Sequence, residues 1–192
     1  AAGRKIREIF INKIIEAKGF QQVESFMDGI LMPTPAAVLN AAKLLAEGTG
    51  KEAGWGELMA VDPGGATTDV YSVAEGAPTK DGIMWKGMPE PKVKRTVEGD
   101  LGMRHSAKAA LESLAGRGWC DHVEWEALVR YVDLFNADPA YLPAREKEFD
   151  LEAKLGMAIV EMAVERHAGY LETSYGPMGA VFLQHGKDLT RV

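Results

Sequence analysis

Residues with the chemistry of a phosphate site are concentrated in one short stretch of the sequence. Two carboxylates, two adjacent glycines and two hydroxyls fall within eight residues: Asp62, Gly64, Gly65, Thr67, Thr68 and Asp69. Glycines lack a Cβ, so their backbone N–H groups can approach phosphate oxygens closely, and hydroxyls add donors. Carboxylates hold a hard cation, usually through its water. This spacing therefore predicts a site for phosphate and magnesium.

The same stretch also suits a simple surface turn. Asp-Pro-Gly-Gly, residues 62–65, is favourable turn chemistry, and composition alone supports the turn and the phosphate site equally. An apolar run before the turn predicts a short buried strand over 57–61 that delivers Asp62. A second run predicts a strand over 67–74, with alternate residues from Asp69 onward on one face. These two strands would position both carboxylates.

Helical periodicity and capping residues account for most of the remaining chain. Apolar residues at helical spacing predict an amphipathic helix over 4–18. Thr34 suits an N-cap and Pro35 the first position of an alanine-rich helix that runs to about Glu47. Three further helices are expected: one with apolar positions from Ala107 to Leu114, one capped by Asp121, and one from about Ala144 to Ala168.

Two other segments carry weaker signals. Gly48-Thr49-Gly50-Lys51 superficially matches a Walker A loop, but Leu45 stands where the first glycine is needed and Glu52 follows the lysine. We interpret this segment as a helix stop and a loop. A short strand is expected near 83–85, where Trp85 would pack within the protein or contact a partner.

Composition limits the classes of function. The net charge of −6 argues against a nucleic-acid-binding surface, which is normally basic. No apolar run approaches the length of a membrane span, so no membrane is expected as a partner. The single cysteine, Cys120, fits a reducing compartment, and a cytoplasmic location is expected. The four histidines show no metal-ligand spacing.

The motif at 62–69 resembles the second phosphate motif of the actin-like ATPases, Asp-x-Gly-Gly-x-Thr-x-Asp. That superfamily includes actin, sugar kinases and DnaK-type chaperones. Gly-Gly-Ala-Thr-Thr-Asp-Val, residues 64–70, looks most like the MutL/GlmL proteins, and so does Arg-Thr-Val-Glu-Gly-Asp-Leu-Gly-Met-Arg, residues 95–104. Proteins of this family are encoded beside adenosylcobalamin-dependent glutamate mutase and related aminomutases. They are unrelated to the mismatch-repair protein of the same name.

The resemblance implies specific site residues. Asp62 and Asp69 are the candidate metal ligands and the candidate catalytic carboxylates. The candidate cofactor-binding residues are Gly64, Gly65, Ala66, Thr67, Gly99 and Asp100. Arg95 or Arg104 would contact phosphate or Asp62, although a capped helix start with a surface ion pair explains that segment equally well. Glu152 and Lys154 are candidates for the border of an adenine pocket, although solvated charges explain them as well.

The resemblance also implies a fold class. We expect an α/β fold, part of a ribonuclease H-like, actin-like ATPase with additional helices. Residues 1–192 would form its central part, with a connecting helix and the second phosphate motif over 19–75 and a helical part over 95–170. The superfamily's first phosphate motif and its adenosine motif are not found in this sequence. The full-length protein is expected to use Mg-ATP, whereas these residues alone would bind it weakly or not at all.

The function implied is an ATP-dependent chaperone, or reactivating factor, for an adenosylcobalamin-dependent mutase, whose subunits would be the partners. One alternative is an ATP-dependent hydrolase of the hydantoinase and oxoprolinase type. A second is a nucleotide-binding scaffold that does not hydrolyse ATP. Met32 favours slow or absent hydrolysis, because the DnaK-type chaperones have a glutamate at that position and a thioether cannot take a proton from water. Pro63 is a second departure, since the family position is usually Ile, Leu or Val.

Overall fold

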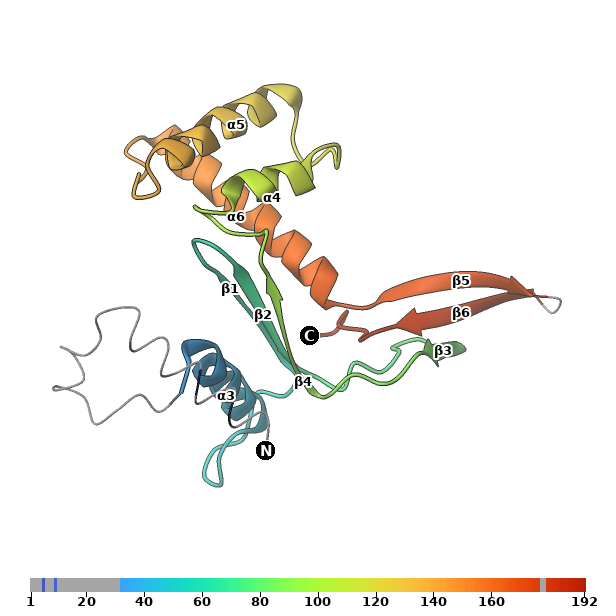
Figure 1. Ribbon diagram of the computed structural model, residues 1–192. Coiled ribbons are helices and arrows are strands. Elements are labelled where there is room, and N and C mark those ends of the chain that lie inside the picture. The colour runs from blue at the N-terminus through green and yellow to red at the C-terminus, as the bar shows by residue number, and fades with distance from the viewer. Residues whose placement is uncertain (1–4, 6–8, 10–31, 177–178) are drawn as a thin grey trace. The chain divides into compact units, whose positions relative to one another are not determined.

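The computed structural model describes residues 5, 9, 32–176 and 179–192 (Figure 1). The chain divides into two units, Ala1–Ala41 and Ala42–Val192. The helix predicted over 4–18 lies almost entirely outside the described residues.

The alanine-rich helix predicted after Pro33 is α3, Thr34–Glu47. Its first turn is closed by the carbonyl oxygen of Pro33, which accepts hydrogen bonds from Ala36 and Ala37 at 3.0 and 3.1 Å. The helix ends at Gly48, whose φ of 78° is readily adopted only by glycine. The predicted end near Glu47 is confirmed, whereas the predicted start is one residue late, because Thr34 is already helical and Pro33 takes the N-cap position.

The first sheet contains three antiparallel strands in the order β1-β2-β4. They are β1, Leu58–Pro63, β2, Thr68–Val73, and β4, Val93–Glu98. The two strands predicted on either side of the glycine turn are therefore confirmed as a hairpin. Pro63 lies within β1 and pairs with Thr68 at the hairpin end, a position where proline is tolerated. β4 was not predicted from the sequence.

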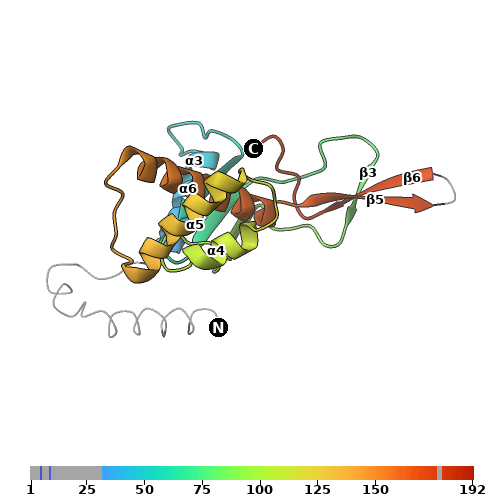
Figure 2. The same cartoon turned by 90° about the horizontal axis from the view of Figure 1, so that it is seen from above.

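Three helices follow the sheet strands: α4, Ala107–Leu114, α5, His122–Ala137, and α6, Glu146–His167 (Figures 1 and 2). α6 packs against the sheet, and α5 packs against both α4 and α6. All three predicted helices are confirmed. The predicted cap of α5 is present, because the Asp121 carboxylate accepts the Glu124 N–H at 2.8 Å. α6 contacts all three strands. The buried residues of this core include Val70, Leu111, Leu128, Phe135, Leu155, Ile159 and Met162.

A second sheet has the strand order β3-β6-β5 (Figure 1). Its strands are β3, Ile83–Lys86, β5, Tyr170–Gly176, and β6, Gly179–His185. β3 is the short strand expected near 83–85, and it runs parallel to β6. β5 and β6 are antiparallel. Two sheets and four α-helices of more than one turn confirm a mixed α/β class for the described residues.

Candidate phosphate-binding site

The two predicted carboxylates face each other across the β1–β2 hairpin. Asp62 and Asp69 are paired in register, so their side chains lie on the same face of the sheet. Their neighbours Val61 and Val70 lie on the opposite face and pack against the helical core. Asp62 is exposed. The hairpin therefore presents two carboxylates beside the glycine loop, on the face away from α6.

The loop between the strands, residues 64–67, has its carbonyl oxygens occupied. Gly64 accepts the N–H of Met103 at 2.9 Å, and Gly65 accepts those of Arg104 and His105 at 2.9 and 2.8 Å. The N–H groups behave differently. That of Gly64 donates to Thr67 O at 2.8 Å, whereas those of the next three residues donate to no acceptor in the described part of the chain.

Three consecutive N–H groups without an acceptor among the described residues, at an exposed loop, form an arrangement suited to an anion. Gly65 and Ala66 are exposed and Thr67 is half-buried. The carbonyls of Gly65 and Ala66 accept hydrogen bonds from residues 104–106, and that of Thr67 accepts the Gly64 N–H, so the N–H groups of these three residues are the loop's remaining polar groups for phosphate oxygens. Their role in binding phosphate remains a prediction.

The segment 99–106 supports the loop from the other side. A Cβ added to Gly102 would lie 2.5 Å from the carbonyl carbon of Ala66 and 2.7 Å from Gly65 O. Only glycine permits this close approach of two backbones. Ser106 Oγ lies 2.6 Å from Ala66 O and 3.2 Å from Gly99 O, so it links Gly99 to the loop. Gly102 and Ser106 were not among the predicted site residues.

Asp69 is held by an arginine. Arg95 on β4 approaches Asp69 Oδ1 with Nε at 2.7 Å and with a terminal nitrogen at 2.6 Å. The Arg95 guanidinium also lies 5.9 Å from the ring of Tyr71. Burial, with the nearby Asp69 carboxylate, raises the pKa of Tyr71. Arg95 therefore contacts the predicted site through Asp69, and not through Asp62.

The two threonines of the motif have separate environments. Thr68 is fully buried, and its Oγ1 donates to Leu101 O at 2.6 Å. This hydroxyl fixes the hairpin to the 99–106 segment and is not available to a ligand. Thr67 remains the candidate hydroxyl for phosphate.

Asp100 is engaged by α6. Arg166 donates to both carboxylate oxygens of Asp100, at 2.7 and 2.9 Å, and to Glu98 at 3.0 Å. These hydrogen bonds hold the pKa of Asp100 below its ordinary value. Two residues were expected at the edge of the site. Gly99 is linked to Ala66 through the Ser106 hydroxyl, whereas the Asp100 carboxylate is ion-paired with Arg166 of α6.

Arg104 also points to α6. Its terminal nitrogen donates to Glu152 at 2.5 Å, and its guanidinium lies 4.4 Å from the ring centre of Phe135. The other oxygen of Glu152 accepts the hydroxyl of Tyr131 at 2.8 Å. Burial and this carboxylate raise the pKa of Tyr131. Arg104 hydrogen-bonds to the phosphate loop through its backbone N–H, whereas its guanidinium is bound to Glu152, which is committed to this cluster.

A magnesium ion would find two carboxylates here. No group of three or more His, Cys, Asp or Glu side chains that could hold a metal occurs among the described residues. Magnesium usually keeps several waters and is bound through one or two carboxylates plus substrate phosphates. Asp62 and Asp69 fit that pattern, with Asp62 exposed and Asp69 shared with Arg95. Their role as metal ligands remains a prediction.

Comparison with known proteins gives the family. The sequence model of the family described as MutL protein matches residues 1–192. The chain belongs to the MutL protein family. It is 49% identical over 197 residues to Protein MutL of Clostridium tetanomorphum. The match covers 100% of the chain and 42% of that relative, so the chain spans less than half of the relative's length. No solved structure matches the chain significantly.

The loop at 48–51 and the Lys154 side chain both have structural partners. The segment at 48–51 ends α3, as expected: Gly48 N–H donates to Leu44 O at 2.8 Å, and the Thr49 hydroxyl accepts from Lys51 and Glu52 at 3.2 and 3.1 Å. Lys154 forms an ion pair with Glu124. Among the helices described, none has the length and apolar character needed to cross a bilayer.

Proposed function

We propose that the full-length protein is a cytoplasmic, ATP-dependent chaperone that reactivates an adenosylcobalamin-dependent mutase, either glutamate mutase or a related aminomutase. Membership of the MutL family supports the association with such a mutase, since the MutL/GlmL proteins that the sequence resembles are encoded beside these enzymes. The observation that carries the nucleotide-binding part is the row of three N–H groups at Gly65, Ala66 and Thr67 without acceptors among the described residues.

In this proposal each residue of the hairpin has a defined task. The N–H groups of 65–67 and the Thr67 hydroxyl bind phosphate oxygens. Asp62 holds magnesium through its water, and Asp69 supports that shell while Arg95 balances its charge. Magnesium, when bound, would neutralise charge on the phosphates. Gly99 lies at the edge of the site, next to Ser106.

We further propose that the chain is part of an actin-like, ribonuclease H-like ATPase with two lobes. Closure of two lobes around a nucleotide couples the nucleotide state to a domain movement. That movement would open a mutase that has lost its radical cofactor and holds a damaged cobalamin. The mixed α/β class of the described residues is consistent with this proposal.

Reactivation is the direct test. A mutase inactivated by loss of its cofactor is incubated with the full-length protein, Mg-ATP and fresh adenosylcobalamin, and we expect mutase activity to return only when all components are present. Asp62→Asn should abolish this recovery and weaken Mg-ATP binding about tenfold or more. Asp81→Asn is the matched control, because Asp81 is an exposed aspartate that forms no hydrogen bond with any of the described residues. Equal recovery with both variants would reject the assigned site.

A scaffold that binds nucleotide without turnover is the second candidate, and Met32 favours it. The Met32 sulfur accepts a hydrogen bond from the Asn40 amide at 3.4 Å, so this position offers a thioether where the chaperones have a carboxylate. Met32→Glu should raise ATP turnover in the full-length protein if this residue limits hydrolysis. The family match favours both candidates over the hydantoinase type, and an ATPase assay with hydantoin or 5-oxoproline separates that type from them.

A further inference from the structure

β5 has an open edge. It forms one side of the second sheet, and within the described part of the chain it pairs only with β6 (Figure 1). The pairing with β6 is continuous over all seven residues of Tyr170–Gly176, without a bulge, and β5 contains no proline. The outer backbone donors and acceptors of this strand are therefore available for another strand.

Within the part of the chain that the structure describes, this edge lacks the usual protection. Natural edges are protected by charged residues, prolines, bulges or a covering element. The single charge on β5 is Glu172, and it is neutralised by Lys86 Nζ at 2.9 Å and lies 2.5 Å from His185 Nε2. Such an edge favours pairing with a further strand.

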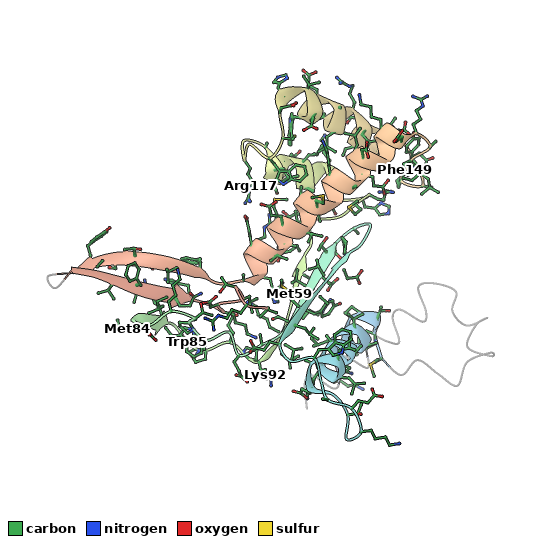
Figure 3. The ribbon with its side chains drawn as sticks, turned by 180° about the vertical axis from the view of Figure 1, so that it is seen from behind. Met59, Met84, Trp85, Lys92, Arg117 and Phe149 are labelled. Carbon is green, nitrogen blue, oxygen red and sulfur yellow. The ribbon has the colours of Figure 1, made fainter. Side chains whose placement is uncertain are left out.

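One face of this sheet carries no charge. Side chains alternate between faces along a strand, so the residues paired in register define each face. The uncharged face carries Leu171, Thr173, Tyr175, Ala180, Phe182 and Trp85. Tyr175 is 84% exposed and Leu171 46%. Figure 3 shows Trp85 on β3, the strand at the opposite edge of this sheet, and Trp85 is also exposed.

We propose that two copies of this chain associate by antiparallel pairing of β5 with β5, centred on Thr173. This register pairs all seven residues of the strand. On the uncharged face it forms two symmetry-related pairs, in each of which Leu171 of one copy lies opposite Tyr175 of the other. It places Glu172 opposite Ser174, which avoids two carboxylates facing each other. Centring the pair on residue 172 would place Glu172 opposite Glu172 of the second copy, and like charges directly opposite each other destabilise a sheet.

The self-complementarity of the strand argues for a second copy as the occupant. An apolar–aromatic pair across strands is among the favourable pairs of a sheet, and here both partners come from the same seven residues. A twofold axis through Thr173 makes the interface isologous, as in most homodimers. The two three-stranded sheets join into one, in which neither copy of β5 is an edge strand any longer. This inference does not depend on the nucleotide site.

The test is the oligomeric state of the full-length protein, measured by sedimentation over a range of concentrations. We expect a reversible dimer for the natural sequence. Thr173→Lys and Thr173→Glu, at an exposed position, should each weaken the dimer about tenfold or more, because two like charges then meet at the axis. Mixing the two variants should restore dimers, since lysine then faces glutamate.

Ser174→Lys is the matched control, on the adjacent exposed residue. It adds the same charge to the same strand but faces Glu172 of the second copy, so the dimer should be retained. A protein that is monomeric at all concentrations overturns the proposal. So does a dimer that responds equally to Thr173→Lys and Ser174→Lys, or one that the mixture of charged variants fails to restore. Circular dichroism shows that each variant is folded.

Discussion

Gly102 lies so close to Ala66 that a Cβ at position 102 would fall 2.5 Å from the Ala66 carbonyl carbon. This contact joins the two sequence motifs that resemble the MutL/GlmL family, residues 64–70 and 95–104, by their backbones. The hydrogen bonds from residues 103–105 to the carbonyls of Gly64 and Gly65 depend on the same approach. The shape of the phosphate loop is therefore set by a glycine far from it in sequence.

Substitution of Gly102 should displace the loop. For Gly102→Ala we expect a loss of about 1–3 kcal/mol of unfolding free energy, as in overpacked sites, because the methyl group meets backbone that cannot move aside without breaking hydrogen bonds. Denaturant unfolding measures the loss. Gly99→Ala is the control, since a Cβ at Gly99 meets no atom within 4 Å. Equal stability of both variants would contradict the close approach.

Gly65→Ala tests the loop as a phosphate site without disturbing the fold. A Cβ here would lie 3.8 Å from the Arg104 Cβ, an ordinary contact, and Gly65 has no positive φ. Stability should change by less than about 1 kcal/mol. Binding of Mg-ATP to the full-length protein should still weaken, about tenfold, because the methyl group obstructs the phosphate oxygens. Calorimetry with ATP measures this, and unchanged affinity would place the phosphates elsewhere.

The Asp69–Arg95 ion pair should stabilise the hairpin. Because Arg95 is one-third exposed, solvent screening limits the interaction, and we expect a coupling energy of about 1 kcal/mol in a double-mutant cycle. The cycle compares Asp69→Asn, Arg95→Gln and the double variant in denaturant unfolding. Additive losses in stability would show that the two side chains do not interact.

His167 gives the fold a dependence on pH. Its ring is fully buried, with Nε2 2.8 Å from the Ser72 hydroxyl and Nδ1 2.8 Å from that of Thr96. Burial, reinforced by the charges of Lys94 and Lys187, lowers its pKa to about 4. The unfolded chain takes up the proton near pH 6.5, well before the folded chain does. Protonation therefore favours the unfolded state as the pH falls from about 6.5 to about 4.

The expected loss over that interval is about 3 kcal/mol, apart from other groups. Denaturant unfolding at pH 7 and at pH 4.5 measures it. His167→Gln should reduce the pH dependence, while His122→Gln, an exposed histidine on α5, should retain it. A natural-sequence protein with equal stability at both pH values would refute this account.

Periodicity and capping were sufficient to predict the helices and the β1–β2 hairpin. The residues that specify these elements lie within or next to the elements themselves, as the apolar stripe of α6 and the Asp121 cap of α5 do. β4 was missed because Lys94 and Arg95 read as surface charges, whereas their partners, His167 O and Asp69, come from distant segments. β5 was missed because an exposed strand carries no burial pattern.

The residues of the candidate site likewise include some that the sequence could predict and some that it could not. The carboxylates and glycines of residues 62–69 form a local pattern that the sequence shows directly. The roles of Gly102 and Ser106 depend on how closely two backbones approach each other, which no spacing in the sequence records. The same is true of the Arg104 side chain, for which a contact with phosphate or Asp62 and an ion pair were equally expected; the structure shows the ion pair, with Glu152.

The segment between Asp100 and Arg104 is held to α6 at both of its ends, by Arg166 and by Glu152. The same segment is hydrogen-bonded to the phosphate loop. A ligand that shifts the loop would therefore pull on α6 at two points, Glu152 near its start and Arg166 near its end. Because both ends of the 22-residue helix are attached, the helix would move as one rigid body.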